Sequence, residues 1–125
     1  MNQETLLQFL KLSADNDGQV LFRVHDDQVE YPPTIGWVVE FRFVTSSDKF
    51  ISIDDIMAYN DVVKDIGEDA YLIIDKPKGG LYALSFGLRF FSRTIARSVY
   101  RANAFRNMDG VGIFDLRANK WVRGL

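Results

Sequence analysis

The chain has 125 residues, of which 47% are hydrophobic and 14% aromatic, and it contains no cysteine. A chain of this length can bury a core of its own, and this composition excludes wholesale disorder. Without cysteine, neither a disulfide framework nor a cysteine-ligated zinc site is possible, so we expect a cytoplasmic protein. Residues 1–125 are predicted to form a single globular domain.

The N-terminal residues lack the basic and apolar regions of a signal peptide. The apolar stretches along the chain are far shorter than the roughly 20 residues that span a bilayer. We therefore expect a soluble protein without a membrane contact.

The net charge of −2 conceals an uneven distribution of charged residues. Residues 1–75 hold 15 acidic and 5 basic residues, whereas residues 76–125 hold 2 acidic and 10 basic residues. Such asymmetry is typical of a contact with a charged partner, and it also arises when two halves of one fold attract each other. Because no linker divides the chain, the second interpretation is the simpler one.

The first predicted element is a helix over residues 3–13, with Asn2 as its N-cap. A polar turn follows, and β-branched and apolar residues then predict strands at 20–24 and 29–31. The two prolines after the second strand end it, because proline cannot donate to a strand ladder.

Residues 36–45 carry the clearest strand pattern of the chain. Trp37, Val39, Phe41 and Phe43 alternate with Val38, Glu40, Arg42 and Val44. This alternation predicts an antiparallel strand with one buried aromatic face and one partly exposed face.

The second half of the chain predicts two further helices and four strands. A helix is expected to start after a capping sequence at residues 52–55 and to share a face made of Ile56, Tyr59, Val63 and Ile66. A hairpin of strands at 70–75 and 81–86 follows, and then a long helix over about 88–107 and strands at 111–116 and 121–122.

Hairpins, not βαβ units, dominate this order of elements. We therefore predict an α+β fold: a mainly antiparallel twisted sheet of about five to seven strands with two or three packed helices, the longest near residues 88–107.

The predicted long helix carries a stripe of arginines. Arg89, Arg93, Arg97 and Arg101 recur at every fourth position and would lie on one side of a helix. The opposite, core-facing side is expected to consist of Leu88, Phe91, Ile95, Val99 and Ala102. Phe90 and Tyr100 are expected on the arginine side, and no acidic residue lies between Arg89 and Arg106.

Three interpretations of this stripe stay open. In the first, the arginines are solvated or pair with the acidic first half of the chain. In the second, they form a protein interface, because Tyr and Arg are enriched at such interfaces. In the third, they bind nucleic acid. The isoelectric point near 5.3 counts against nucleic acid. The candidate binding residues are Arg89, Phe90, Arg93, Arg97, Tyr100 and Arg101.

No motif in the sequence requires catalytic chemistry. The single histidine, His25, sits in an expected hairpin turn, and the lysines and glycines at 76–80 lack the spacing of a phosphate loop. The acidic pairs have local explanations as turns or caps. We predict no catalytic residue, no metal ligand and no cofactor, and we lean towards a protein that is not an enzyme.

The leading hypothesis is a small interaction protein that self-associates, first of all as a dimer, and binds an acidic protein partner through the third helix. An alternative is a small-molecule-binding protein or minor enzyme with an apolar pocket lined by some of the aromatic residues. Nucleic-acid binding through the arginine stripe is the third hypothesis.

Overall fold

The computed structural model of the chain describes residues 2–16, 19–42, 53–75, 83–104 and 111–122. The expected loop at 76–80, the capping residue at 52 and the ends of the predicted strand 36–45 and helix 88–107 lie outside these residues. In the described part the helices are α1 (Gln3–Asp15), α2 (Ile53–Lys64) and α3 (Arg93–Ala104). The strands are β1 (Leu21–Arg23), β2 (Gln28–Glu30), β3 (Trp37–Arg42), β4 (Ala70–Asp75), β5 (Ala83–Phe90), β6 (Val111–Asp115) and β7 (Lys120–Trp121).

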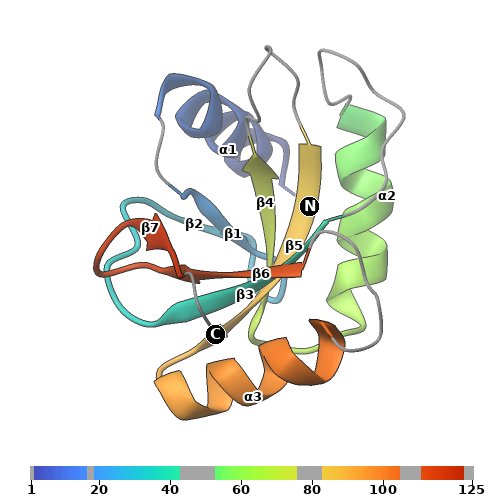
Figure 1. Cartoon of the computed structure of the whole chain (residues 1–125). Coiled ribbons are helices and arrows are strands. Elements are labelled where there is room, and N and C mark those ends of the chain that lie inside the picture. Colours follow the sequence, from blue (N-terminus) through green and yellow to red (C-terminus); the bar gives the residue numbers. More distant parts are fainter. Residues whose placement is uncertain (1, 17–18, 43–52, 76–82, 105–110, 123–125) are drawn as a thin grey trace.

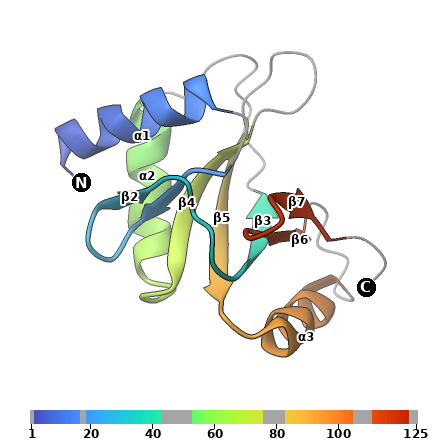
Figure 2. The same ribbon diagram turned by 90° about the vertical axis from the view of Figure 1, so that its left-hand side faces the viewer.

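The seven strands form one sheet in the order β2-β1-β4-β5-β3-β6-β7, and each pairs antiparallel with its neighbours. The sheet curls into a half-barrel (Figures 1 and 2). The predicted α+β class, the antiparallel sheet and the order of the elements are confirmed. Strands β2 and β7 are the two edges of this sheet.

All three helices pack on one face of the sheet. Helices α1 and α2 cover β1, β4 and β5 through a core that includes Phe9, Phe22, Ile56 and Leu72. Helix α3 covers the other half, where Ala96 packs with Val39, Phe41 and Ile113. Figure 1 shows α1 at the upper left, α2 along the right-hand side and α3 beneath the sheet.

Helix α1 begins as the sequence predicts. The Asn2 side chain accepts a hydrogen bond from the backbone N–H of Glu4, at 2.8 Å, and a longer one from that of Thr5. This satisfies N–H groups that have no partner within the helix. Leu6 and Phe9 then point into the core.

Strand β3 differs from the prediction in one respect. Val39 and Phe41 are buried on the helix side as expected, but Val38 and Glu40 on the other face are also buried. Strand β3 lies between β5 and β6, and the curl of the sheet encloses its second face with Leu21, Ile73 and Phe114. A partly exposed face was therefore the wrong expectation for this strand.

The start of the third helix is the main correction. We predicted it at Leu88, but β5 continues to Phe90 because Leu88, Arg89 and Phe90 pair with Val39, Val38 and Trp37. Helix α3 begins at Arg93, where the Ser92 hydroxyl accepts a hydrogen bond from the N–H of Ile95. Its described length of 12 residues equals that of α2 and is one less than that of α1.

Gly87 lies in the middle of β5 and does not separate two elements. A Cβ atom there would collide with Cγ1 of Val38 and would lie 2.9 Å from Cδ1 of Ile73. These two side chains close over the Gly87 backbone from the neighbouring strands. The tight curl of the sheet at this point therefore depends on the missing side chain.

Candidate binding surface at the start of helix α3

The six candidate residues divide between two elements. Arg89 and Phe90 belong to β5, whereas Arg93, Arg97, Tyr100 and Arg101 belong to α3. The four arginines therefore do not form one helical stripe.

Arg89 is buried, with 7% of its surface exposed, and has a structural role. Its guanidinium donates to both carboxylate oxygens of Glu30, at 3.0 and 2.9 Å, and its Nε and Nη2 donate to the carbonyl oxygen of Ile35. Burial by itself lowers the pKa of Arg89, but interactions with Glu30 and, secondly, with Tyr71 together outweigh it, so the pKa is raised. We considered that the arginines of the stripe pair with the acidic first half of the chain, and Arg89 does so through Glu30.

Phe90 and Tyr100 do not lie among the arginines as predicted. Both are partly buried and pack against the core cluster that α3 forms with β3 and β6. With the helix starting at Arg93, its buried side runs through Ala96, Val99 and Tyr100. The expectation of exposed aromatics beside the arginines is wrong for these two residues.

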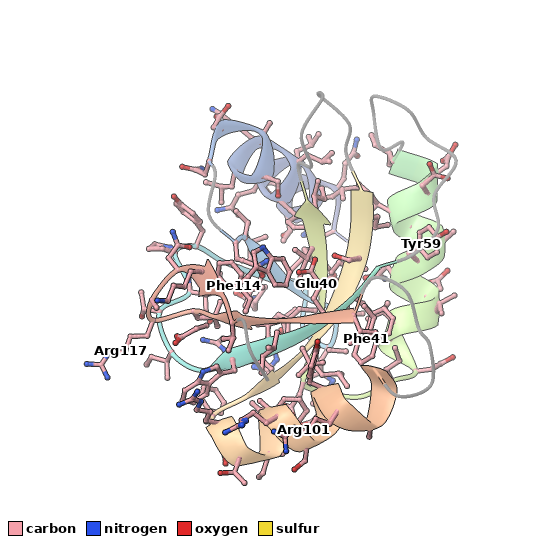
Figure 3. The ribbon with its side chains drawn as sticks, in the orientation of Figure 1. Glu40, Phe41, Tyr59, Arg101, Phe114 and Arg117 are labelled. Atoms are coloured by element: carbon pink, nitrogen blue, oxygen red, sulfur yellow. The ribbon has the colours of Figure 1, made fainter. Side chains whose placement is uncertain are left out.

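Arg93, Arg97 and Arg101 remain as the cationic residues of α3. Arg93 and Arg101 are exposed and Arg97 is half-buried. Among the residues that the structure describes, none of the three forms an ion pair or a side-chain hydrogen bond. Arg101 lies on α3 at the lower edge of the molecule (Figure 3). These three charges are available to a partner.

Exposed apolar residues that we did not predict accompany these charges. Phe91 and Ile95, which we expected in the core, are 67% and 53% exposed, and Ile35 is 63% exposed. The Phe91 ring lies close to Gly36, next in the chain to Ile35, and 5.3 Å from the Arg89 guanidinium carbon. The signal in the sequence was Ser92, a typical N-cap residue, which places the first helical turn after Phe91.

A pocket opens between the start of α3 and the hairpin of β6 and β7. Its volume is about 890 Å³, and it is lined by Trp37, Arg93, Phe114, Asp115, Asn119, Lys120, Trp121 and Val122. Trp37 pairs with Asp115 across β3 and β6, and Asp115 pairs with Lys120 across the hairpin, so the sheet brings these residues together. Arg93, one of the six predicted binding residues, belongs to this lining.

The position of Trp121 is fixed by its neighbours. Its ring meets that of Phe114 edge to face, with the centroids 5.2 Å apart. It also lies over Gly112, where a Cβ atom would come within 2.7 Å of the ring. Trp121 nevertheless keeps 39% of its surface exposed. It is thus an ordered aromatic residue at the surface, on the edge strand of the sheet.

A buried polar cluster occupies the concave face of the sheet. Glu40, only 1% exposed, accepts hydrogen bonds from the hydroxyl of Ser85 and from the side-chain amide of Gln19. Figure 3 shows Glu40 in the middle of the sheet. Because all three side chains are buried, no substrate reaches them, and we assign the cluster a structural role.

His25 lies at the surface, with its Nε2 atom 3.8 Å from a carboxylate oxygen of Glu68. Within the described ranges, no three His, Asp or Glu side chains are grouped so that they could hold a metal ion. The helices of this same part of the chain are too short or too polar to cross a membrane.

Comparison of the chain with protein-family models, with curated proteins and with solved structures found no match.

Proposed function

We propose that this chain is a self-associating interaction protein that uses the exposed side of α3 as its binding surface. The observation that carries the proposal is the combination of Arg93, Arg97 and Arg101, which have no ion-pair partner among the described residues, with the exposed apolar residues Phe91 and Ile95. Arginine and aromatic residues are enriched at protein interfaces, where apolar contacts supply affinity and charges supply specificity.

A complementary surface is present on α2 of the same chain. Its outer side exposes the apolar residues Ile53, Met57 and Val62, and Ile66 is exposed just after the helix. Three acidic residues, Asp54, Asp61 and Asp65, are exposed on the same segment. Opposite charges next to apolar side chains favour contact between α3 of one copy and α2 of another.

Such a contact joins two different surfaces, because α2 and α3 lie on different sides of the molecule (Figure 1). It is therefore head-to-tail and leads to a closed ring or to a chain of copies. An acidic amphipathic helix of another protein would offer the same chemistry to α3.

The experiment blocks each surface with an acidic residue. Ile95→Asp places a negative charge on α3, and Val62→Asp adds one to the already acidic α2. We expect the unmodified chain to sediment as an oligomer that dissociates at high salt, and each variant alone to sediment with a lower mass. Leu7→Asp on α1, where the side chain is 52% exposed, is the matched control and should behave like the unmodified chain.

Mixing the two variants tests the head-to-tail arrangement. Val62→Asp retains an intact α3 and Ile95→Asp an intact α2, so an equimolar mixture should form a 1:1 dimer that grows no further. An unmodified chain that sediments as a monomer at every protein concentration would overturn the proposal. A mixture that stays monomeric while the unmodified chain is oligomeric would remove α2 as the partner surface.

A further inference from the structure

The pocket between α3 and the hairpin of β6 and β7 has the chemistry of a small-ligand site. Its volume of about 890 Å³ falls within the range of 300–1,000 Å³ in which proteins hold small molecules. Both tryptophans of the chain, Trp37 and Trp121, line it.

Two cations line the same pocket. Arg93 comes from the first residue of α3 and Lys120 from β7, and both are exposed. In the parts of the chain that the structure describes, neither side chain has an ion-pair or hydrogen-bond partner. An arginine fork and a lysine ammonium next to aromatic rings are suited to a carboxylate that is attached to an apolar body.

One acidic residue limits the charge that the pocket accepts. Asp115 belongs to the lining, and its Oδ1 atom accepts a hydrogen bond from the N–H of Ala118 in the β6–β7 turn. Among the lining residues that the structure describes, two cations and one carboxylate leave a single net positive charge. A ligand with one negative charge balances it, whereas a ligand with several negative charges would be repelled by Asp115.

We propose that this pocket binds a planar aromatic monocarboxylate. The ligand's ring lies against Trp37, which shares one face of the sheet with Lys120, and its carboxylate is held by Arg93 and Lys120. This site shares Arg93 with the α3 surface invoked above, whereas Trp37 and Lys120 belong to neither of the surfaces proposed for self-association.

The two tryptophans allow a direct test by fluorescence. No other tryptophan contributes to the signal. Phenylacetate, which does not absorb where tryptophan is excited, is the probe, and we expect a saturable change in emission with a dissociation constant of about 1 mM or lower. Phenethylamine, which has the same ring with a positive charge, and acetate, which has the charge without the ring, should both fail to saturate.

Substitutions then assign the charges. Lys120→Met and Arg93→Met should each weaken phenylacetate binding about tenfold or more, because each removes a charge-assisted contact. Arg117→Met is the matched control: Arg117 is exposed in the β6–β7 turn, projects outwards in Figure 3 and does not line the pocket. It should bind phenylacetate like the unmodified chain.

The Val62→Asp variant, whose substitution lies on α2 and outside the pocket lining, separates this site from self-association, since phenylacetate binding should persist in it unchanged. The proposal is overturned if phenylacetate produces no saturable change, if acetate or phenethylamine binds equally well, or if Arg117→Met weakens binding as much as Lys120→Met. If a peptide that ends in phenylalanine binds at least tenfold more tightly than phenylacetate, the ligand is the C-terminus of a peptide chain and not a free aromatic acid.

Discussion

Arg89 on β5 and Glu30 on β2 form a bidentate ion pair, although strands β1 and β4 lie between β2 and β5 in the sheet. In a flat sheet, strands three positions apart would be separated by roughly 14 Å. The contact at 2.9 Å is possible because the sheet curls, and the guanidinium lies over the ring of Tyr71 on the intervening β4. This pair therefore joins an edge strand to the centre of the half-barrel.

The first prediction concerns the stability that this pair provides. Arg89→Met should lower the free energy of unfolding by about 1–3 kcal/mol, because it removes the partner of the half-exposed Glu30 and the donors to the Ile35 carbonyl. Chemical denaturation followed by circular dichroism measures this change. Arg117→Met, at an exposed arginine, should stay within about 0.5 kcal/mol of the unmodified chain.

The pH dependence of this effect follows from the pKa of Arg89, which is raised above its ordinary value. A raised pKa of a basic group adds stability that is present below the unfolded-state pKa and is lost only above it. Because that pKa already lies far above neutral, the loss caused by Arg89→Met should not vary between neutral and moderately alkaline pH. A loss that disappears as the pH is raised through that range would contradict the charged pairing.

The second prediction tests the close approach at Gly87. Gly87→Ala should destabilise the fold by about 1–3 kcal/mol, because the added methyl group collides with Val38 and Ile73. Val38→Ala removes the nearest obstacle, so Gly87→Ala should cost less in a Val38→Ala background than in the unmodified chain. A double-mutant cycle measures this coupling. Equal costs in both backgrounds would show that the collision with Val38 is not responsible.

The third prediction concerns the buried Glu40–Ser85 hydrogen bond. Ser85→Ala should lower the free energy of unfolding by about 1–3 kcal/mol, since it removes a donor from a carboxylate that is shielded from water. Ser98→Ala is a matched control on α3, where an exposed hydroxyl donates to the Thr94 carbonyl. That change should alter stability by less than about 0.5 kcal/mol. Similar effects of the two substitutions in thermal or chemical denaturation would argue against a stabilising role of the buried pair.

Much of the fold follows from local patterns. The Asn2 cap, the alternation from Trp37 to Phe41 and the hairpin-rich order of elements all depend on neighbouring residues, so the sequence predicts them correctly. Alternation also runs from Leu84 through Phe86 and Leu88 to Phe90, on the side that faces the helices. Continuing this pattern to its end would have placed the boundary of β5 where the structure has it.

The candidate site was predicted less well, because spacing alone does not distinguish a helix from the end of a strand. Arg89 is four residues before Arg93, which is a helical interval, yet its backbone pairs with Val38. Moving the helix start from Leu88 to Arg93 changed which residues are exposed. It placed Tyr100 against the core and left Phe91 and Ile95 at the surface.

From its own patterns, then, the chain specified an antiparallel α+β fold, the approximate elements and a cationic third helix, because these depend on residues close together along the chain. Strand pairing and the curl of the sheet decided which arginine is buried and where apolar side chains remain exposed. They also brought Trp37, Arg93 and Lys120 to the lining of one pocket. Those contacts join residues far apart along the chain, so no local pattern encodes them.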